Sequence, residues 1–278
     1  MIIDAHQHFW KVARTDYGWL TPDLTALYRD FLPGDLDPLL VASGVTGTVI
    51  VQAAPSEAET LFLLDLAREW PKACAVVGWI DMTSPQAEKH LGSLAQDPKL
   101  RGIRPMIQDE ADPEWMLQAS VGAAFQAVGR CGLTFDALVR PHQLPTLTRL
   151  MDRFPDVPVV VDHGAKPAIG AEAFQPWAND IAAFSKRPQV MCKLSGLLTE
   201  AGPRATDTDL IPYVEHLLDC FGPARLMWGS DWPVLTTAGD YDGWLDQAGR
   251  LVQGLGAAEQ AQIFGRTAAR FYGFQETS

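Results

Sequence analysis

Residues 157–163 read VPVVVDH and residues 45–52 read VTGTVIVQ, two short runs rich in β-branched apolar residues. Such runs are typical of strands that are buried on both faces, as in a parallel sheet. Together with six similar runs, they give eight candidate strands: Ile2–Ala5, Thr48–Gln52, Ala75–Trp79, Gly102–Met106, Leu133–Val139, Val157–Asp162, Val190–Leu194 and Arg225–Trp228.

Longer amphipathic stretches alternate with these runs and predict helices. They are Ser56–Trp70, Ser84–Leu94, Pro113–Gly129, Leu144–Phe154, Phe174–Ser185, Asp207–Cys220, Tyr241–Gln253 and Ala257–Tyr272. Ser56 and Glu59 have the spacing of a capping box at the start of the first helix. Strand alternating with helix predicts a (β/α)₈ TIM barrel, with residues 1–278 as a single domain. A doubly wound open sheet is the alternative, and the lack of a Gly-rich loop after the first strand weighs against it.

The composition excludes several classes of protein. Of the 278 residues, 47% are hydrophobic and 20% are charged, which excludes a disordered chain and allows a large core. The formal net charge is −12, so we expect neither nucleic acid nor an anionic membrane as a partner. No apolar run reaches the roughly 18 residues that a membrane-spanning helix needs.

The start of the chain and the cysteines favour a cytoplasmic location. The chain begins MIIDAHQHFW, without the basic stretch, apolar run and cleavage site of a signal peptide. The four cysteines, at positions 74, 131, 192 and 220, are far apart and form no CxxC pair. We expect reduced, structural thiols, with two disulfides of a secreted protein as the alternative.

Two histidines end the first predicted strand, in the order His6-Gln7-His8. Residues two apart on a strand point to the same side, about 7 Å apart along it. Active sites of (β/α)₈ barrels lie at the carboxyl ends of the strands, and imidazole is a favoured zinc ligand. The pair therefore predicts metal binding or catalysis, although surface histidines would give the same pattern.

His163 and Asp231 follow two later strands, in the stretches VVVDHGAKP and LMWGSDWP. A core histidine and a turn-capping carboxylate are the structural alternatives. Three histidines and one aspartate at three strand ends nevertheless form a pattern of three or four ligands, with room for water.

The motifs HxH, DHGAKP, CKLSGL and GSDWP, in this order, resemble the amidohydrolase superfamily (amidohydrolase-related family 2) over nearly the whole chain. Within it, they look most like the sugar-lactone and dicarboxylate lactonases. The resemblance implies a distorted barrel, with His6, His8, His163 and Asp231 as catalytic residues and as ligands of a single divalent ion, zinc by type. Related decarboxylases hold one zinc with this set of ligands, whereas some related lactonases act without metal. The resemblance therefore leaves open whether the ion is needed for turnover.

Three cations also lie at predicted strand ends: Arg104, Arg140 and Lys193. Arginine suits bidentate contact with carboxylates, so we expect these cations to bind substrate oxygens. For Lys193, a buried salt bridge with Asp231 or Asp162 is the alternative. Further substrate contacts are expected from Gln52, Trp10 and Trp232, and the aromatic segment His8–Pro33 is expected to cover the pocket.

We therefore expect a hydrolase that opens a small sugar-acid lactone, such as an L-fucono-, L-rhamnono- or L-galactono-lactone, with Asp231 as general base. A zinc-dependent decarboxylase of an aromatic carboxylic acid is the first alternative. A barrel that binds a sugar acid without turnover is the second. The sequence leaves open whether the protein is a homo-oligomer.

Overall fold

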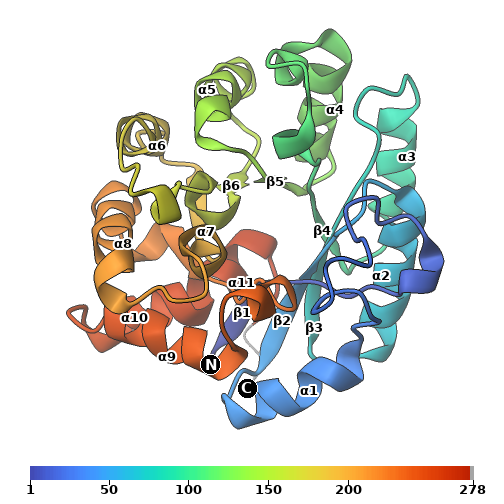
Figure 1. The fold of residues 1–278 in the computed structure, drawn as a ribbon. Helices are drawn as coiled ribbons and strands as arrows, with labels where there is room; N and C mark the ends of the chain where they lie inside the picture. The colour runs from blue at the N-terminus through green and yellow to red at the C-terminus, as the bar shows by residue number, and fades with distance from the viewer. Residues whose placement is uncertain (276–278) are drawn as a thin grey trace.

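The computed structural model describes residues 1–275 and shows eight parallel strands in a nearly closed barrel (Figure 1). Each strand pairs with the next one along the chain. The strands are β1 (Ile3–Gln7), β2 (Gly47–Val51), β3 (Ala73–Gly78), β4 (Leu100–Ile103), β5 (Thr134–Ala137), β6 (Val159–Val161), β7 (Val190–Leu194) and β8 (Leu226–Trp228). The predicted (β/α)₈ fold is confirmed, and residues 276–278 of the predicted domain lie outside the described residues.

Helices alternate with the strands and surround the barrel (Figure 1). They are α1 (Pro33–Ala42), α2 (Glu57–Glu69), α3 (Ala87–Leu94), α4 (Ala119–Arg130), α5 (Leu144–Arg153), α6 (Trp177–Ser185), α7 (Leu197–Ala201), α8 (Asp207–Phe221), α9 (Tyr241–Leu251), α10 (Ala257–Ala261) and α11 (Thr267–Tyr272). The sequence patterns do not predict α1, which contains Gly34 and Pro38, or the one-turn α7. The helix predicted over residues 257–272 is interrupted by a π-helical turn, Gln262–Arg266.

The barrel interior is filled by side chains of the strands and of α11. The cluster consists of Ile3, Ala5, Val49, Val51, Ala75, Val77, Val160 and Met227, joined by Ala268 and Tyr272 of α11. A larger apolar core lies between the strands and the surrounding helices. Because α11 contributes two side chains to the inner cluster, this helix is part of the barrel core.

The seam between β8 and β1 is closed by the residues that follow β8. In the described chain these two strands join through a short bridge between Gln7 and Trp232. The Asp4 carboxylate spans the seam: it accepts hydrogen bonds from Ser230 N (2.8 Å), Ser230 Oγ (2.6 Å) and Tyr241 Oη (2.9 Å). This seam carries the GSDWP stretch, so the Asp4 contacts also fix the backbone next to Asp231.

The predicted capping box at α2 is half correct. Ser56 Oγ accepts the Glu59 N–H at 3.1 Å, as expected. The Glu59 carboxylate turns away from Ser56 and accepts the N–H groups of Ala53 (3.0 Å) and Ala54 (2.8 Å). It does so because the chain folds back between β2 and α2, which leaves those two buried amides without a ladder partner. Glu59 thus stabilises the loop at the carboxyl end of β2.

The described residues also bear on the predicted compartment. All four cysteines are free thiols, as expected: Cys74, Cys131, Cys192 and Cys220. Within residues 1–275, no helix combines the length and the apolar character that crossing a membrane requires.

Glu59 gives the first prediction. Burial raises its pKa from 4.5 to about 8, against the opposing backbone hydrogen bonds. Between these two pH values, the folded chain therefore keeps a proton on Glu59 that the unfolded chain loses. The contribution of this proton to the free energy of unfolding is full below pH 4.5 and is lost as the pH rises through about 8. We expect Glu59→Gln to remove this part of the pH dependence, a change of a few kcal/mol at about 1.4 kcal/mol per pKa unit.

Urea unfolding of both proteins at pH 4.5, 6 and 8 measures the effect. Glu69→Gln is the matched control, because Glu69 is an exposed carboxylate of the same helix. Parallel stability profiles for wild type and Glu59→Gln would contradict the prediction.

Candidate active site

Strand β1 brings two histidines to the carboxyl end of the barrel. His6 lies in β1 and His8 follows the strand directly, so both side chains point to the same side. Both are buried, and their Nε2 atoms are 3.2 Å apart. Gly229 makes room for this arrangement, since a Cβ at that position would lie 2.7 Å from His6 Cβ.

His163 and Asp231 reach the same place through strained backbone. They follow β6 and β8, with φ of 53° and 60°. Non-glycine residues rarely adopt this left-handed conformation, which costs about 1–3 kcal/mol at each position and is concentrated at functional sites. The Asp231 N–H donates to the His6 carbonyl at 2.8 Å, so the seam of the barrel holds one strained residue in place.

The outer ring nitrogens of two histidines have fixed partners. Nδ1 of His8 donates to the Val51 carbonyl at 2.8 Å, which leaves the lone pair on Nε2. Nδ1 of His163 lies 2.8 Å from Ser195 Oγ. These contacts turn both Nε2 atoms inward, as the outer contacts of metal-binding histidines do.

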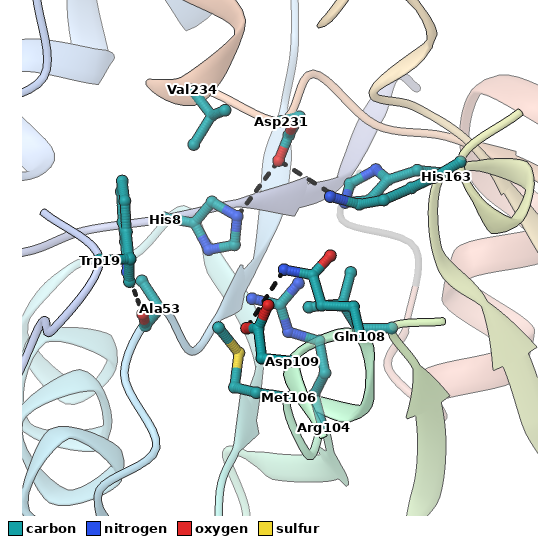
Figure 2. Close-up of a pocket in the computed structure, with 12 residues that line it drawn as sticks. His8, Trp19, Ala53, Arg104, Met106, Gln108, Asp109, His163, Asp231 and Val234 are labelled. Atoms are coloured by element: carbon teal, nitrogen blue, oxygen red, sulfur yellow. Dashed lines mark hydrogen bonds and ion pairs between the residues drawn. The ribbon is translucent and has the colours of Figure 1, made fainter. Parts of the chain in front are cut away.

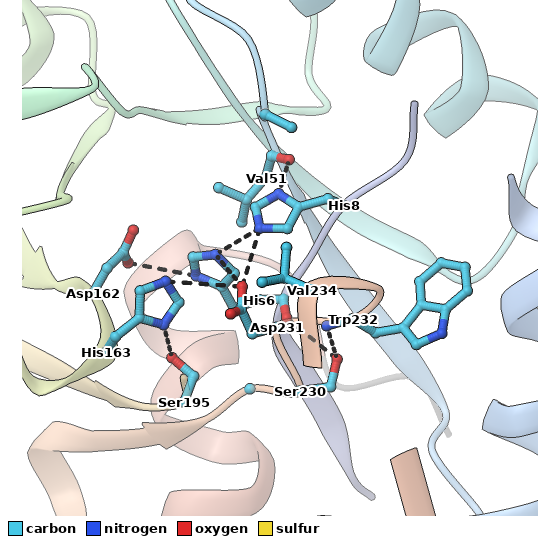
Figure 3. A network of polar contacts seen from close by, with 12 residues as sticks. His6, His8, Val51, Asp162, His163, Ser195, Ser230, Asp231, Trp232 and Val234 are labelled. Atoms are coloured by element: carbon cyan, nitrogen blue, oxygen red, sulfur yellow. Dashed lines mark hydrogen bonds and ion pairs between the residues drawn. The ribbon is translucent and has the colours of Figure 1, made fainter. Parts of the chain in front are cut away.

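Four side chains converge on one point and form what we call the His/Asp cluster: His6, His8, His163 and Asp231 (Figure 3). From Oδ1 of Asp231, the Nε2 atoms lie at 3.2 Å (His8), 3.6 Å (His6) and 3.8 Å (His163). Ligand atoms of His6, His163 and Asp231 all lie within 4.8 Å of one another. Imidazole nitrogens with one carboxylate oxygen suit zinc, so the donor set fits a divalent ion. The structure thus brings together the four residues named from sequence.

Electrostatics set the protonation of the cluster. Burial alone would raise the pKa of Asp231, but the neighbouring histidines outweigh it and hold this pKa below its ordinary value. Burial lowers the pKa of His163 to about 4, against the attraction of Asp231. Burial and the Lys193 ammonium lower the pKa of His6 well below 6.5. At neutral pH the cluster therefore combines an ionised carboxylate with neutral rings at His6 and His163, the state that both metal binding and base catalysis need.

A pocket of about 230 Å³ opens above this cluster (Figure 2). It is lined by His8, Trp19, Ala53, Arg104, Met106, Gln108, Asp109, Leu138, His163, Lys166, Asp231 and Val234. In Figure 2, the labelled cluster residues face Arg104, Gln108 and Asp109 across the cavity. The volume is below the roughly 300–1,000 Å³ of pockets for drug-sized ligands, so it suits a small molecule.

Comparison with known proteins identifies the family. A model of the amidohydrolase family matches residues 3–274. The chain belongs to the amidohydrolase family. This amidohydrolase is 46% identical over 274 residues to an L-fucono-1,5-lactonase of Burkholderia ambifaria, with 97% of this chain and 94% of the relative covered. It is 39% identical to an L-fucono-1,5-lactonase of Burkholderia multivorans, with 99% and 96% covered.

A solved structure supports the same assignment. A crystal structure of an amidohydrolase from Burkholderia multivorans with bound zinc superposes with a TM-score of 0.92 at 38% identity. The match covers 99% of this chain and 100% of that chain. The superfamily resemblance drawn from the motifs is thereby confirmed.

Among the predicted substrate contacts of this amidohydrolase, Arg104 lies on the pocket wall. Lys193 and Gln52 do not. Lys193 is fully buried beneath the pocket and forms the buried salt bridge with Asp162 that was its alternative, together with a second one to Asp136. The Gln52 side chain is also buried, and its amide donates to the Arg104 carbonyl at 2.5 Å. Both side chains therefore lie behind the pocket wall.

Trp10, Trp232 and Arg140 also lie outside the pocket wall. Trp10 is buried, and its indole N–H donates to the Arg29 carbonyl at 2.8 Å. Trp232 packs edge-on against Phe31, with ring centroids 5.3 Å apart. Arg140 is exposed at the start of the turn after β5. The two tryptophans therefore pack against the segment that follows β1, and Arg140 is exposed to solvent.

Other residues take the places on the wall. Trp19, from the predicted covering segment 8–33, lines the pocket and donates its indole N–H to the Ala53 carbonyl at 2.7 Å. Lys166, within the DHGAKP motif, also lines the pocket, and its Nζ lies 3.8 Å from Oε1 of Glu200. Its position three residues after His163 could have been used to find it. Gln108 and Asp109 follow β4 with no distinctive sequence signal.

Gly196 generates the second prediction, because it lies against the His163 ring. A Cβ on Gly196, whose φ is +66°, would lie 2.6 Å from Nδ1 of His163. We expect Gly196→Ala to destabilise the protein by about 1 kcal/mol from backbone strain and by about 2 kcal/mol more from displacing the ring. Urea unfolding measures the sum, and a crystal structure of the variant shows the ring.

Gly132 provides the matched control, since its φ is +69° and a Cβ there would have no neighbour within 4 Å. Gly132→Ala should show the strain alone. Equal losses of stability in the two variants would mean that Gly196 does not make room for His163.

Proposed function

We propose that this amidohydrolase hydrolyses the lactone of a six-carbon sugar acid, with L-fucono-1,5-lactone as the first substrate to test. The observation that carries the proposal is the 46% identity with an L-fucono-1,5-lactonase over nearly the whole chain. The chain is an enzyme with lactonase activity, and its His/Asp cluster provides the groups that water attack on an ester requires. L-Rhamnono- and L-galactono-lactones are the alternative substrates to compare.

In the proposed mechanism, Asp231 acts as general base. Its lowered pKa keeps it ionised at neutral pH, and it lies at the pocket wall. Asp231 takes a proton from water as the water oxygen bonds to the lactone carbonyl carbon. When the ring C–O bond breaks, the same carboxyl group returns the proton to the ring oxygen. The product is a hydroxy acid, and no other reactant is consumed.

The charge that develops on the carbonyl oxygen needs cationic neighbours. Arg104 and Lys166 both line the pocket, so we propose that they stabilise this oxyanion and the carboxylate product. The remaining wall has two kinds of surface. Gln108 and Asp109 offer hydrogen bonds to sugar hydroxyls, whereas the indole of Trp19 offers an apolar face to the ring.

We also propose that the His/Asp cluster holds one divalent ion, zinc by its donor set. When bound there, such an ion would polarise the lactone carbonyl as a Lewis acid. The decarboxylase alternative is weaker, because the two full-length relatives at 39% and 46% identity are L-fucono-1,5-lactonases. A cytoplasmic location remains a proposal that rests on the free cysteines.

The third prediction concerns Asp231. We expect Asp231→Asn to lower kcat for L-fucono-1,5-lactone by about 10²- to 10⁴-fold with little change in KM, because the base is lost and the pocket wall keeps its shape. Acid release followed with a pH indicator measures both constants. Asp109→Asn, on the same wall, should mainly raise KM.

Near-normal kcat in Asp231→Asn would rule out Asp231 as the base. A wild-type protein that leaves every lactone of a sugar-acid panel intact, but releases carbon dioxide from an aromatic carboxylic acid, would favour the decarboxylase. Binding without any turnover would favour the sugar-acid binding protein.

The fourth prediction concerns the ion. After equilibration with zinc and removal of free metal, elemental analysis should find about one zinc per wild-type chain and almost none in His163→Asn/Asp231→Asn, since zinc needs several protein ligands. His142→Asn, at an exposed position in a turn, is the control and should keep its zinc. Equal zinc in all three proteins would place the ion elsewhere.

A further inference from the structure

Lys193, a cation named from the sequence, contacts the His/Asp cluster from inside the barrel. Its side chain is fully buried in β7. Nζ lies 2.5 Å from Oδ2 of Asp136, 3.0 Å from Oδ1 of Asp162 and 3.2 Å from Nδ1 of His6. The ammonium is therefore held by two carboxylates and directed at one ring of the site.

The contacts extend from Lys193 to the last helix. The Tyr272 hydroxyl of α11 donates to Oδ2 of Asp136 at 2.6 Å, and Tyr272 is buried in the barrel interior. On the other side, Nη1 of Arg104 lies 3.3 Å from Oδ2 of Asp162. Two buried cations thus balance two buried carboxylates, as the cost of an unpaired buried charge demands.

His6 differs from the other two histidines in its outer contacts. Nδ1 of His8 faces a backbone carbonyl and Nδ1 of His163 faces a hydroxyl. Nδ1 of His6 instead faces the Lys193 ammonium at 3.2 Å and the Asp162 carboxylate at 3.6 Å. A donor and an acceptor next to one nitrogen support either tautomer of the ring. Its Nε2 can then face Asp231 as a bare nitrogen or as an N–H.

We propose that Lys193 is a positioning residue for His6, held in turn by Asp136 and by the Tyr272 hydroxyl of the C-terminal helix. Lys193 then acts through His6 and makes no contact with substrate. The inference rests on the proposed lactonase function for its kinetic readout, and the structural readout below is independent of that function.

The test uses a charge-balanced variant. Lys193→Met alone would leave a buried carboxylate unpaired and could prevent folding, whereas Lys193→Met/Asp136→Asn removes one charge of each sign. We expect this double variant to unfold at a urea concentration close to that of the wild type. We expect its kcat for L-fucono-1,5-lactone to fall by about 10- to 100-fold at unchanged KM, the usual loss when an outer partner of a site histidine is removed. Its crystal structure should show the His6 ring turned away from Asp231.

Tyr272→Phe is the milder variant, because it removes only the hydroxyl. We expect a several-fold lower kcat at unchanged KM. Tyr213→Phe, on α8 at the outer side of the barrel, is the matched control and should behave as wild type. Tyr272→Phe also tests the proposal if the double variant does not fold. A kcat of Tyr272→Phe equal to that of Tyr213→Phe would then overturn the proposal.

Three results for the double variant would overturn the inference: wild-type kcat, a raised KM at unchanged kcat, or an unmoved His6 ring. The raised KM would mark Lys193 as a substrate contact. If the wild type does not hydrolyse the lactone, the proposed function fails, and the orientation of the His6 ring in the variant still decides the role of Lys193.

Discussion

Charged groups in the barrel interior must be paired, and this constraint determines how the site is built. Lys193 and Arg104 share the interior with Asp136 and Asp162, all of them buried. Burial raises the pKa of Asp136 despite Lys193, whereas Lys193, His6 and Arg104 outweigh burial at Asp162 and hold its pKa well below the ordinary value. Losing one member of such a pair typically costs about 3–5 kcal/mol, so the group is as much a part of the fold as the apolar core.

Two networks, which meet at His6, hold the site: the His6 ring faces Lys193, and the His6 backbone N–H donates to Oδ1 of Asp4 at 3.1 Å. The interior charges hold His6, whereas the Asp4 carboxylate holds Ser230 and, through the backbone, Asp231 at the seam of the barrel. Both networks are buried and are formed between protein groups. Contacts within the protein therefore hold the acid-base groups in place, and fixed charges and dipoles of this kind are those that stabilise a transition state best.

The sequence predicts the positions of the strands better than it predicts whether a polar side chain of a strand faces the pocket or the barrel interior. Apolar runs identify all eight strands, and the HxH, DHGAKP and GSDWP motifs identify the His/Asp cluster, because residue type and position at a strand end suffice there. Whether a polar side chain in a strand faces the mouth or the interior depends on barrel geometry that spacing does not contain. Lys193 was therefore expected in the pocket and lies beneath it. Segment 8–33 contains several aromatic residues, and the sequence does not indicate which of them faces the cavity. The fold of the segment places Trp19 on the pocket wall and Trp10 away from it.

The wall of the pocket and the groups of the His/Asp cluster have different structural origins. Trp19, Met106, Leu138 and Val234 come from segments after four different strands, and the cluster is held from within the barrel. These four side chains take no part in the interior charge pairs or in the Asp4 contacts at the seam. The shape of this part of the wall is therefore free to vary while the charge pairs that hold the cluster stay in place, in keeping with the loop-built active sites of (β/α)₈ barrels.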